Sequence, residues 1–180
     1  MVIKIAKTNN ALLVLVILCL VSCKNNNGKF VKLDPEKTHI NFTNTITESD
    51  SVNIFDFANI YNGGGVGVGD FNNDGLEDLY FTGNMVSNKL YLNKGGMQFE
   101  DITAESGTDG HGIWSRGVAV VDINNDGKLD LYVCATAKRN PAERVNILYV
   151  NQGVDKNNVP VFKDMAQEYG LADTDRKSVV

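Results

Sequence analysis

Two short acidic segments carry the residues whose types and spacing are best suited to chemistry. The first reads DFNNDGLED from Asp70 to Asp78, and the second reads DINNDGKLD from Asp122 to Asp130. In each segment Asp, Asn, Asp and Asp occupy positions 1, 3, 5 and 9, and glycine occupies position 6. Oxygen side chains at alternate positions are suitable ligands for a hard cation, and glycine permits the sharp turn that such a loop requires.

We therefore predict that both segments bind Ca²⁺, which accepts carboxylate, amide and backbone carbonyl oxygens as ligands. The carbonyls of Leu76 and Lys128, at position 7, would supply further ligands. The predicted side-chain ligands are Asp70, Asn72, Asp74, Asp78, Asp122, Asn124, Asp126 and Asp130. Magnesium is disfavoured because it keeps its waters and rarely uses an all-protein cage. The alternative is a pair of Asx-rich hairpin turns that bind no metal.

The segments do not follow the EF-hand pattern, which needs an acidic ligand near position 12 followed by a helix. Position 12 is Phe81 in the first segment and Val133 in the second. Each of these residues ends a strand-like sequence, DLYF or DLYV, that begins at position 9. Each loop is therefore expected to lead into a β-strand.

An internal repeat supplies the elements that must position the loops. The loops begin 52 residues apart, and LYLN at 90–93 matches LYVN at 148–151. The predicted strands are 65–69, 79–82, 89–92 and 99–103 in the first unit, and 117–121, 131–135, 146–150 and 161–165 in the second. Four short strands in about 50 residues are typical of a β-propeller blade. We predict an all-β fold, a β-propeller fragment of about two four-stranded blades with calcium loops. Residues 39–42 are a candidate further strand, and 164–169 a candidate helical turn.

These residues resemble the FG-GAP/VCBS repeat of integrin-like β-propellers, and in particular its cartilage-acidic-protein-like branch, which is associated with the ASPIC/UnbV region. The likeness is carried by YNGGGVGVGDFNNDG at 61–75, NKLYLN at 88–93 and FEDIT at 99–103. It extends over nearly all of 38–172. The resemblance implies a calcium-loop propeller that is exported and often lipid-anchored. The family's C-terminal ASPIC/UnbV region is not in this sequence, as expected for an N-terminal fragment.

The first 22 residues are interpreted as a lipoprotein signal peptide. Lys4 and Lys7 precede an apolar run at 11–21, which is shorter than the roughly 20 residues of a membrane span. The run ends in LVSC, which resembles the bacterial lipobox and predicts acylation of Cys23. Residues 23–37 would then be a polar tether, and the mature protein would be anchored in the cell envelope, at the outer membrane since Lys24 is not Asp. The alternative is an ordinary secretion signal.

The last six residues, 175–180, are interpreted as an artefact. DRKSVV is one translation of a common short-read sequencing adapter, stop codon included. We therefore expect the gene to continue after Thr174, with a third acidic loop at about position 185. The propeller repeats at 38–174 would then be truncated, because two blades cannot close a ring. The alternative is a natural short tail.

Charge and the remaining motifs narrow the function. Seventeen Lys and Arg against 22 Asp and Glu give a formal net charge of −5, which argues against a nucleic-acid binder. No Ser-His-Asp or Cys-His arrangement is recognisable, so we predict a non-enzymatic module that binds a protein or a glycan. The alternative is the non-catalytic part of a polysaccharide-degrading enzyme, and a third possibility is a structural spacer.

One further segment, ahead of the second repeat, is a candidate binding site. His111, Trp114 and Arg116 lie close together in the sequence and could form a ligand mouth, because Trp and Arg are frequent in binding sites. The alternative is that Trp114 packs between blades and His111 is a turn residue.

Overall fold

The computed structural model describes residues 30–136 and 140–174. The chain divides into two compact units, Met1–Leu33 and Asp34–Val180, and every strand that the structure describes belongs to the second. The predicted signal peptide, the acylation site at Cys23 and the adapter-like residues 175–180 lie outside the described residues. Within the described ranges, no helix has the length and apolar character needed to cross a membrane.

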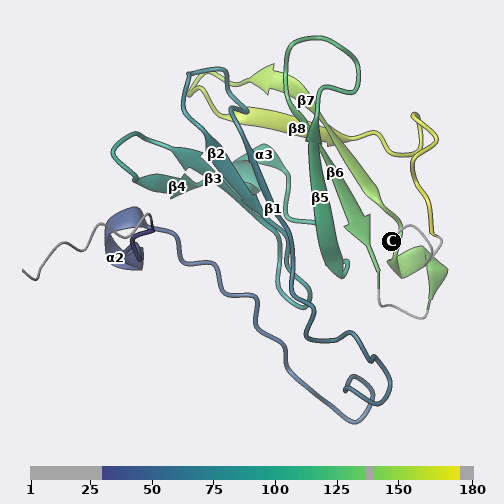
Figure 1. Cartoon of the computed structure of the whole chain (residues 1–180). Coiled ribbons are helices and arrows are strands. Elements are labelled where there is room, and N and C mark those ends of the chain that lie inside the picture. The colour runs from purple at the N-terminus through teal and green to yellow at the C-terminus, as the bar shows by residue number, and fades with distance from the viewer. Residues whose placement is uncertain (1–29, 137–139, 175–180) are drawn as a thin grey trace, which may run out of the picture. The chain divides into compact units, whose positions relative to one another are not determined.

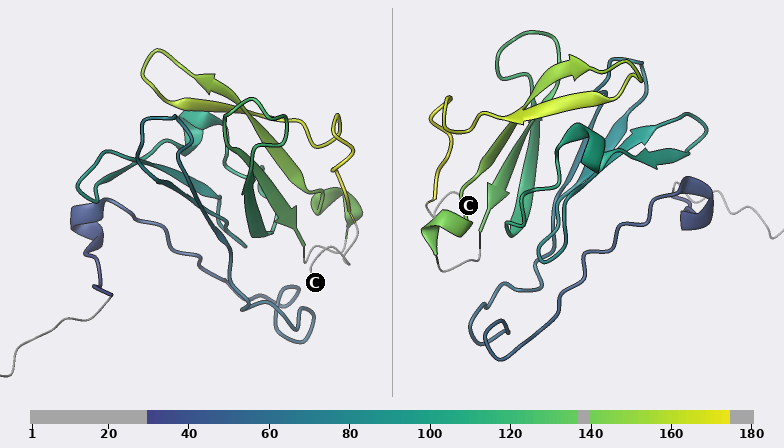
Figure 2. Two further views of the ribbon diagram at one scale, coloured as in Figure 1. Left: turned by 45° about the horizontal axis from the view of Figure 1, so that its top comes forward. Right: turned by 180° about the vertical axis from the view of Figure 1, so that it is seen from behind.

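Two four-stranded antiparallel sheets form the framework of the second unit (Figures 1 and 2). The strands of the first sheet, in spatial order, are β1 (Val66–Gly69), β2 (Asp78–Phe81), β3 (Lys89–Asn93) and β4 (Phe99–Asp101). Those of the second are β5 (Ser115–Val121), β6 (Asp130–Ala135), β7 (Ile147–Val154) and β8 (Pro160–Asp164). Within each sheet, every strand pairs with the next one along the chain, which is the layout of a propeller blade. The predicted all-β class and the two four-stranded units are confirmed.

The two sheets share one hydrophobic core. Tyr80 and Leu90 of the first sheet belong to the same buried cluster as Leu131, Val133 and Tyr149 of the second. These residues come from the central strands, where side chains alternate between the two faces of the sheet. The sheets therefore stabilise one another, and each contributes side chains to one apolar interior.

Glycines in β1 allow the first strands of the two sheets to approach closely. A Cβ atom at Gly67 would lie 3.0 Å from Cγ2 of Val120, and one at Gly69 would lie 2.7 Å from Cδ1 of Leu129. The alternating GVGVG sequence thus places its small residues toward the second sheet. The other face of β1 leaves Val66 and Val68 about half exposed.

The segment before β1 contains no strand of three or more residues within its described part. A four-residue helix, α2 (Pro35–Thr38), is followed by an irregular stretch, so the candidate strand at 39–42 is wrong. Phe42 instead stacks on Phe81 at a ring-centroid distance of 5.1 Å. The backbone amide of Asn41 donates to the hydroxyl of Tyr91 at 3.2 Å. Side-chain contacts, rather than strand pairing, hold this segment against the first sheet.

The observed element boundaries differ from the expected ones near the end of each four-stranded repeat. The fourth strand of the first sheet, β4, stops at Asp101, and α3 (Thr103–Ser106) follows it. After the second sheet, a hydrogen-bonded turn occupies the candidate helical segment 164–169, with the amide of Tyr169 donating to the carbonyl of Met165 at 3.1 Å. The longer connection between β6 and β7 contains a short 3₁₀ helix, η1 (Pro141–Glu143).

Candidate functional site

The acidic loops join the first two strands of each sheet. The first runs from the end of β1 to the start of β2, and the second runs from β5 to β6. Asn73 and Gly75 have positive φ angles of 56° and 87°, and Asn125 and Gly127 have 57° and 81°. Asparagine and glycine tolerate this left-handed conformation better than other residues, so the two sequences dictate the same backbone turn.

In the first loop, the side chains at positions 1, 3 and 5 surround the same short stretch of backbone. The carboxylate of Asp70 accepts the amides of Asp74 at 3.0 Å and Gly75 at 2.8 Å. Oδ1 of Asn72 accepts the same Asp74 amide at 3.3 Å, while its Nδ2 donates to Oδ2 of Asp74 at 2.9 Å. Oδ1 of Asp74 accepts the amide of Leu76 at 2.9 Å. Three oxygen-bearing side chains are thereby gathered on one turn.

The second loop repeats this network and adds a cation. Asp122 accepts the amides of Asp126 at 3.0 Å and Gly127 at 2.9 Å, and Asn124 also accepts the Asp126 amide at 3.0 Å. Here, however, Nζ of Lys128 lies 2.5 Å from Oδ2 of Asp126. Hydrogen bonds from the side chain and the amide of Lys128 hold the pKa of Asp126 below its ordinary value. The first loop has the apolar Leu76 at this position, so the two loops differ in charge.

The aspartates at position 9 have a structural role that the sequence did not reveal. Asp78 is fully buried, and its two oxygens accept the amides of Phe71 at 3.0 Å and Asn93 at 2.8 Å. Burial raises the pKa of Asp78 to about 6, although both amide hydrogen bonds act in the opposite direction. The carboxylate thereby fastens the start of the loop to the end of β3.

The same fastening occurs in the second sheet. Asp130 is fully buried and accepts the amides of Ile123 at 2.9 Å and Asn151 at 2.8 Å. The available signal was the repeated pairing of a position-9 aspartate with an asparagine of the third strand, Asn93 or Asn151. We refer to Asp78 and Asp130 together as the clamp aspartates.

The donor chemistry of positions 1, 3 and 5 fits Ca²⁺, because carboxylate and amide oxygens are its usual ligands. In the first loop Asp70, Asn72 and Asp74 would hold the ion, with the carbonyl of Leu76. Across the described residues, however, no three His, Cys, Asp or Glu side chains gather as a metal-ligand group. Each oxygen of the clamp aspartates already accepts a backbone amide. Calcium binding by the loops therefore stays a prediction.

The first loop is also part of the contact between the sheets. Nδ2 of Asn151 donates to the carbonyl of Phe71 at 2.8 Å, and Nδ2 of Asn73 lies 3.4 Å from the carbonyl of Gly127. Asn72 is only 7% exposed, whereas its counterpart Asn124 in the second loop is exposed. Identical positions of the repeat thus lie in different surroundings.

The three residues of the candidate ligand mouth lie in three different environments. His111 is exposed, with Nδ1 at 3.4 Å from Oδ1 of Asp109. Trp114 is buried and stacks on Phe57, with ring centroids 6.3 Å apart. The guanidinium of Arg116 donates to the carbonyl of Asn59. The structure does not bring these three side chains into one cavity.

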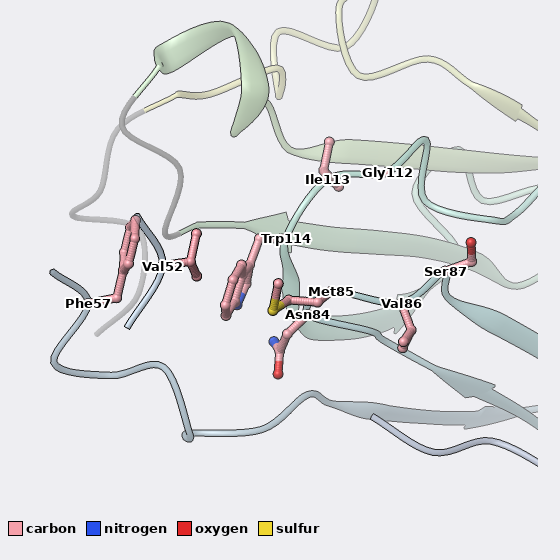
Figure 3. Close-up of a pocket in the computed structure, with 9 residues that line it drawn as sticks. All are labelled: Val52, Phe57, Asn84, Met85, Val86, Ser87, Gly112, Ile113 and Trp114. Atoms are coloured by element: carbon pink, nitrogen blue, oxygen red, sulfur yellow. The ribbon is translucent and has the colours of Figure 1, made fainter. Parts of the chain in front are cut away.

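Trp114 instead forms a wall of a separate cavity of about 240 Å³ (Figure 3). Three segments enclose it: the chain before β1, the β2–β3 connection and the segment that leads into β5. The apolar lining residues are Val52, Phe57, Met85, Val86, Ile113 and Trp114. Of these, only Trp114 was a candidate from the sequence, because the other segments show no recognisable motif.

Comparison with known proteins finds similarity in the region of the two loops. Residues 70–133 match the model of the FG-GAP-like repeat family. Cartilage acidic protein 1 of Xenopus tropicalis is 33% identical over 107 residues, which are 59% of this chain and 16% of that protein. The Homo sapiens protein of the same name is 38% identical over 72 residues, which are 39% of this chain and 11% of that protein. The chain therefore matches only a small part of the length of these relatives. Residues 70–133, which contain both acidic loops, are therefore similar to the FG-GAP-like repeat.

Proposed function

We propose that this chain is a calcium-binding β-propeller module of an envelope lipoprotein, and that it binds a protein or glycan partner without catalysing a reaction. The observation that carries the calcium proposal is the repetition of one Asp-Asn-Asp arrangement, with equivalent amide hydrogen bonds, in both loops. Among the described residues, no lysine or arginine forms an ion pair with Asp70 or Asp74. A dication would neutralise this uncompensated charge.

The ion would act mainly on stability. A ligand that binds the folded chain and not the unfolded one stabilises the fold by mass action. Loops of this oxygen-donor type in extracellular modules bind calcium with dissociation constants of about 10⁻⁴–10⁻³ M. Millimolar calcium should therefore raise the melting temperature of the chain, and a chelator should reverse the effect.

The test compares the purified full chain with Asp74→Ala and with the control Asp50→Ala, which removes an exposed acid outside the loops. Melting temperatures are measured in calcium and in chelator. We expect the wild type and Asp50→Ala to respond to calcium and Asp74→Ala to respond less. If Asp74→Ala lowered the melting temperature equally in calcium and in chelator, Asp74 would not be a calcium ligand. No calcium response in the wild type would favour the metal-free turn.

The anchoring part of the proposal concerns Cys23. A thiol that follows LVS in a lipobox-like sequence is the expected site of acylation. Metabolic labelling with an alkyne fatty acid in a bacterial host should label the wild type and not Cys23→Ser. Labelling that persists in Cys23→Ser would contradict the lipoprotein assignment, while leaving the calcium proposal untouched.

A further inference from the structure

The cavity beside Trp114 has the properties of a small-molecule site. Its volume of about 240 Å³ exceeds the roughly 150 Å³ of an engineered apolar cavity that binds benzene. Phe57 and Trp114 present nearly parallel rings, 19° apart, and Val52, Val86 and Ile113 complete an apolar lining. Charged side chains are absent from the described lining, so the cavity suits an uncharged ligand.

A buried donor within the wall indicates what the ligand must carry. Trp114 is 3% exposed, and its Nε1 has no hydrogen-bond partner among the described residues. Leaving a buried donor unpaired costs about 1–3 kcal/mol, so native proteins usually supply an acceptor. In Figure 3 the indole nitrogen lies toward Met85 and Asn84, which also line the cavity.

The neighbouring amide does not supply that acceptor. Nδ2 of Asn84 donates to the carbonyls of Gly63 at 3.1 Å and Ser115 at 2.9 Å. Its Oδ1 accepts Nδ2 of Asn44 at 2.7 Å. Asn84 therefore serves to hold three segments together and leaves the indole N–H to another group.

Met85 offers a route for that group to reach the indole. Met85 is 41% exposed, and its sulfur accepts a weak hydrogen bond from the amide of Thr47 at 3.4 Å. Methionine is unbranched and adapts readily to a new neighbour, so it can move without disturbing the sheet.

We propose that this cavity binds a small uncharged aromatic molecule that carries a hydrogen-bond acceptor. The ring lies against Trp114 and Phe57, and the acceptor oxygen takes the indole N–H. This site is separate from the acidic loops and does not depend on calcium. At about nine heavy atoms, such a ligand would bind with a dissociation constant on the order of 1 mM.

The chain contains one tryptophan, so its indole N–H gives a single signal in a ¹H–¹⁵N spectrum. Acetophenone, which has a carbonyl acceptor, and ethylbenzene, which has nearly the same shape without oxygen, are titrated into the labelled full chain. We expect acetophenone to move the indole signal downfield in a saturable manner. Ethylbenzene should also bind, shown by saturable shifts of the methyl signals of Val86 and Ile113 in a ¹H–¹³C spectrum, without the downfield shift of the indole signal.

Two variants check the location. Val86→Phe, which fills the cavity, should abolish both responses, whereas Val161→Phe on the exposed side of β8 should leave them unchanged. The wild type alone can overturn the proposal: its indole signal would have to stay in place at about 10 mM acetophenone, ten times the expected dissociation constant. A shift that survives in folded Val86→Phe would also overturn it, because the ligand would then bind elsewhere.

Discussion

Replacing the clamp aspartate Asp78 with alanine tests the difference between a structural carboxylate and a metal ligand. Its two oxygens accept two amides, and the side chain is fully buried. Hydrogen bonds to a charged acceptor contribute about 1.5–3 kcal/mol each. Burial raises the pKa of Asp78 to about 6, so removing the carboxylate also relieves a cost of desolvation. We expect a net loss of about 2–4 kcal/mol in the free energy of unfolding.

The assay is urea denaturation of the full chain in chelator, followed by the fluorescence of Trp114. With a urea dependence of about 1–3 kcal/mol per molar, Asp78→Ala should lower the midpoint by about 0.7–4 M. Asp74→Ala is the matched control, because its exposed carboxylate bonds only within the loop and water can replace it. Its midpoint in chelator should stay close to that of the wild type.

Asp78→Asn refines the comparison. The amide retains one acceptor oxygen but presents an NH₂ group to the second backbone amide, so an intermediate loss is expected. If Asp78→Ala were as stable as the wild type in chelator and lost stability only in calcium, the structural role assigned to the Asp78 carboxylate would be wrong. Asp78 would then act solely as a ligand.

Three further predictions concern the rest of the fold. Lys128→Leu should strengthen calcium binding at the second loop several-fold in calorimetric titrations, because its amine lies against a loop carboxylate; unchanged affinity would show that the amine does not compete. Gly69→Ala should cost about 1–3 kcal/mol in urea denaturation, because its Cβ would lie 2.7 Å from Cδ1 of Leu129, while Gly117→Ala, with its nearest neighbour at 3.9 Å, should be tolerated. Burial by itself would raise the pKa of Asp101, but hydrogen bonds from Lys89 and Thr103 have the larger effect, so the pKa is lowered from its ordinary value of 3.8. Its ionised form therefore adds stability above pH 3.8 that is lost as pH falls through the lower folded value. Both side chains are 37% exposed, so the effect should be below about 1 kcal/mol and should shrink in Lys89→Met.

The strands were predictable because each follows a local signal. The alternation in GVGVG, and the DLYF and LYLN sequences bounded by Asn and Gly, place β1 to β3 within one residue of the observed ends. Helix α3 was missed because FEDIT continues as a strand pattern, whereas the chain turns where the carboxylate of Asp101 accepts hydrogen bonds from the amide and the hydroxyl of Thr103. That turn is a local bond that competes with strand extension.

The candidate site was only partly predictable. The loops are contiguous in sequence, so their oxygen spacing could be recognised directly. The role of Asp78 depends on Asn93, 15 residues away, and on a burial that composition does not encode. The cavity depends on Phe57, which comes from a segment without periodicity and reaches Trp114 only in the folded chain. Contacts of this kind are set by tertiary packing and leave no local pattern.

The position of the first loop between the sheets has a mechanical consequence. A force that separated the sheets would have to stretch the bond from Asn151 to the carbonyl of Phe71 and the contact between Asn73 and Gly127. These attachments lie in the load path, whereas the exposed Asn124 of the second loop does not. Anything that stiffens the first loop would therefore raise the force needed to open the joint. The second loop takes part in these attachments only through the carbonyl of Gly127, so the same stiffening there should raise the rupture force less.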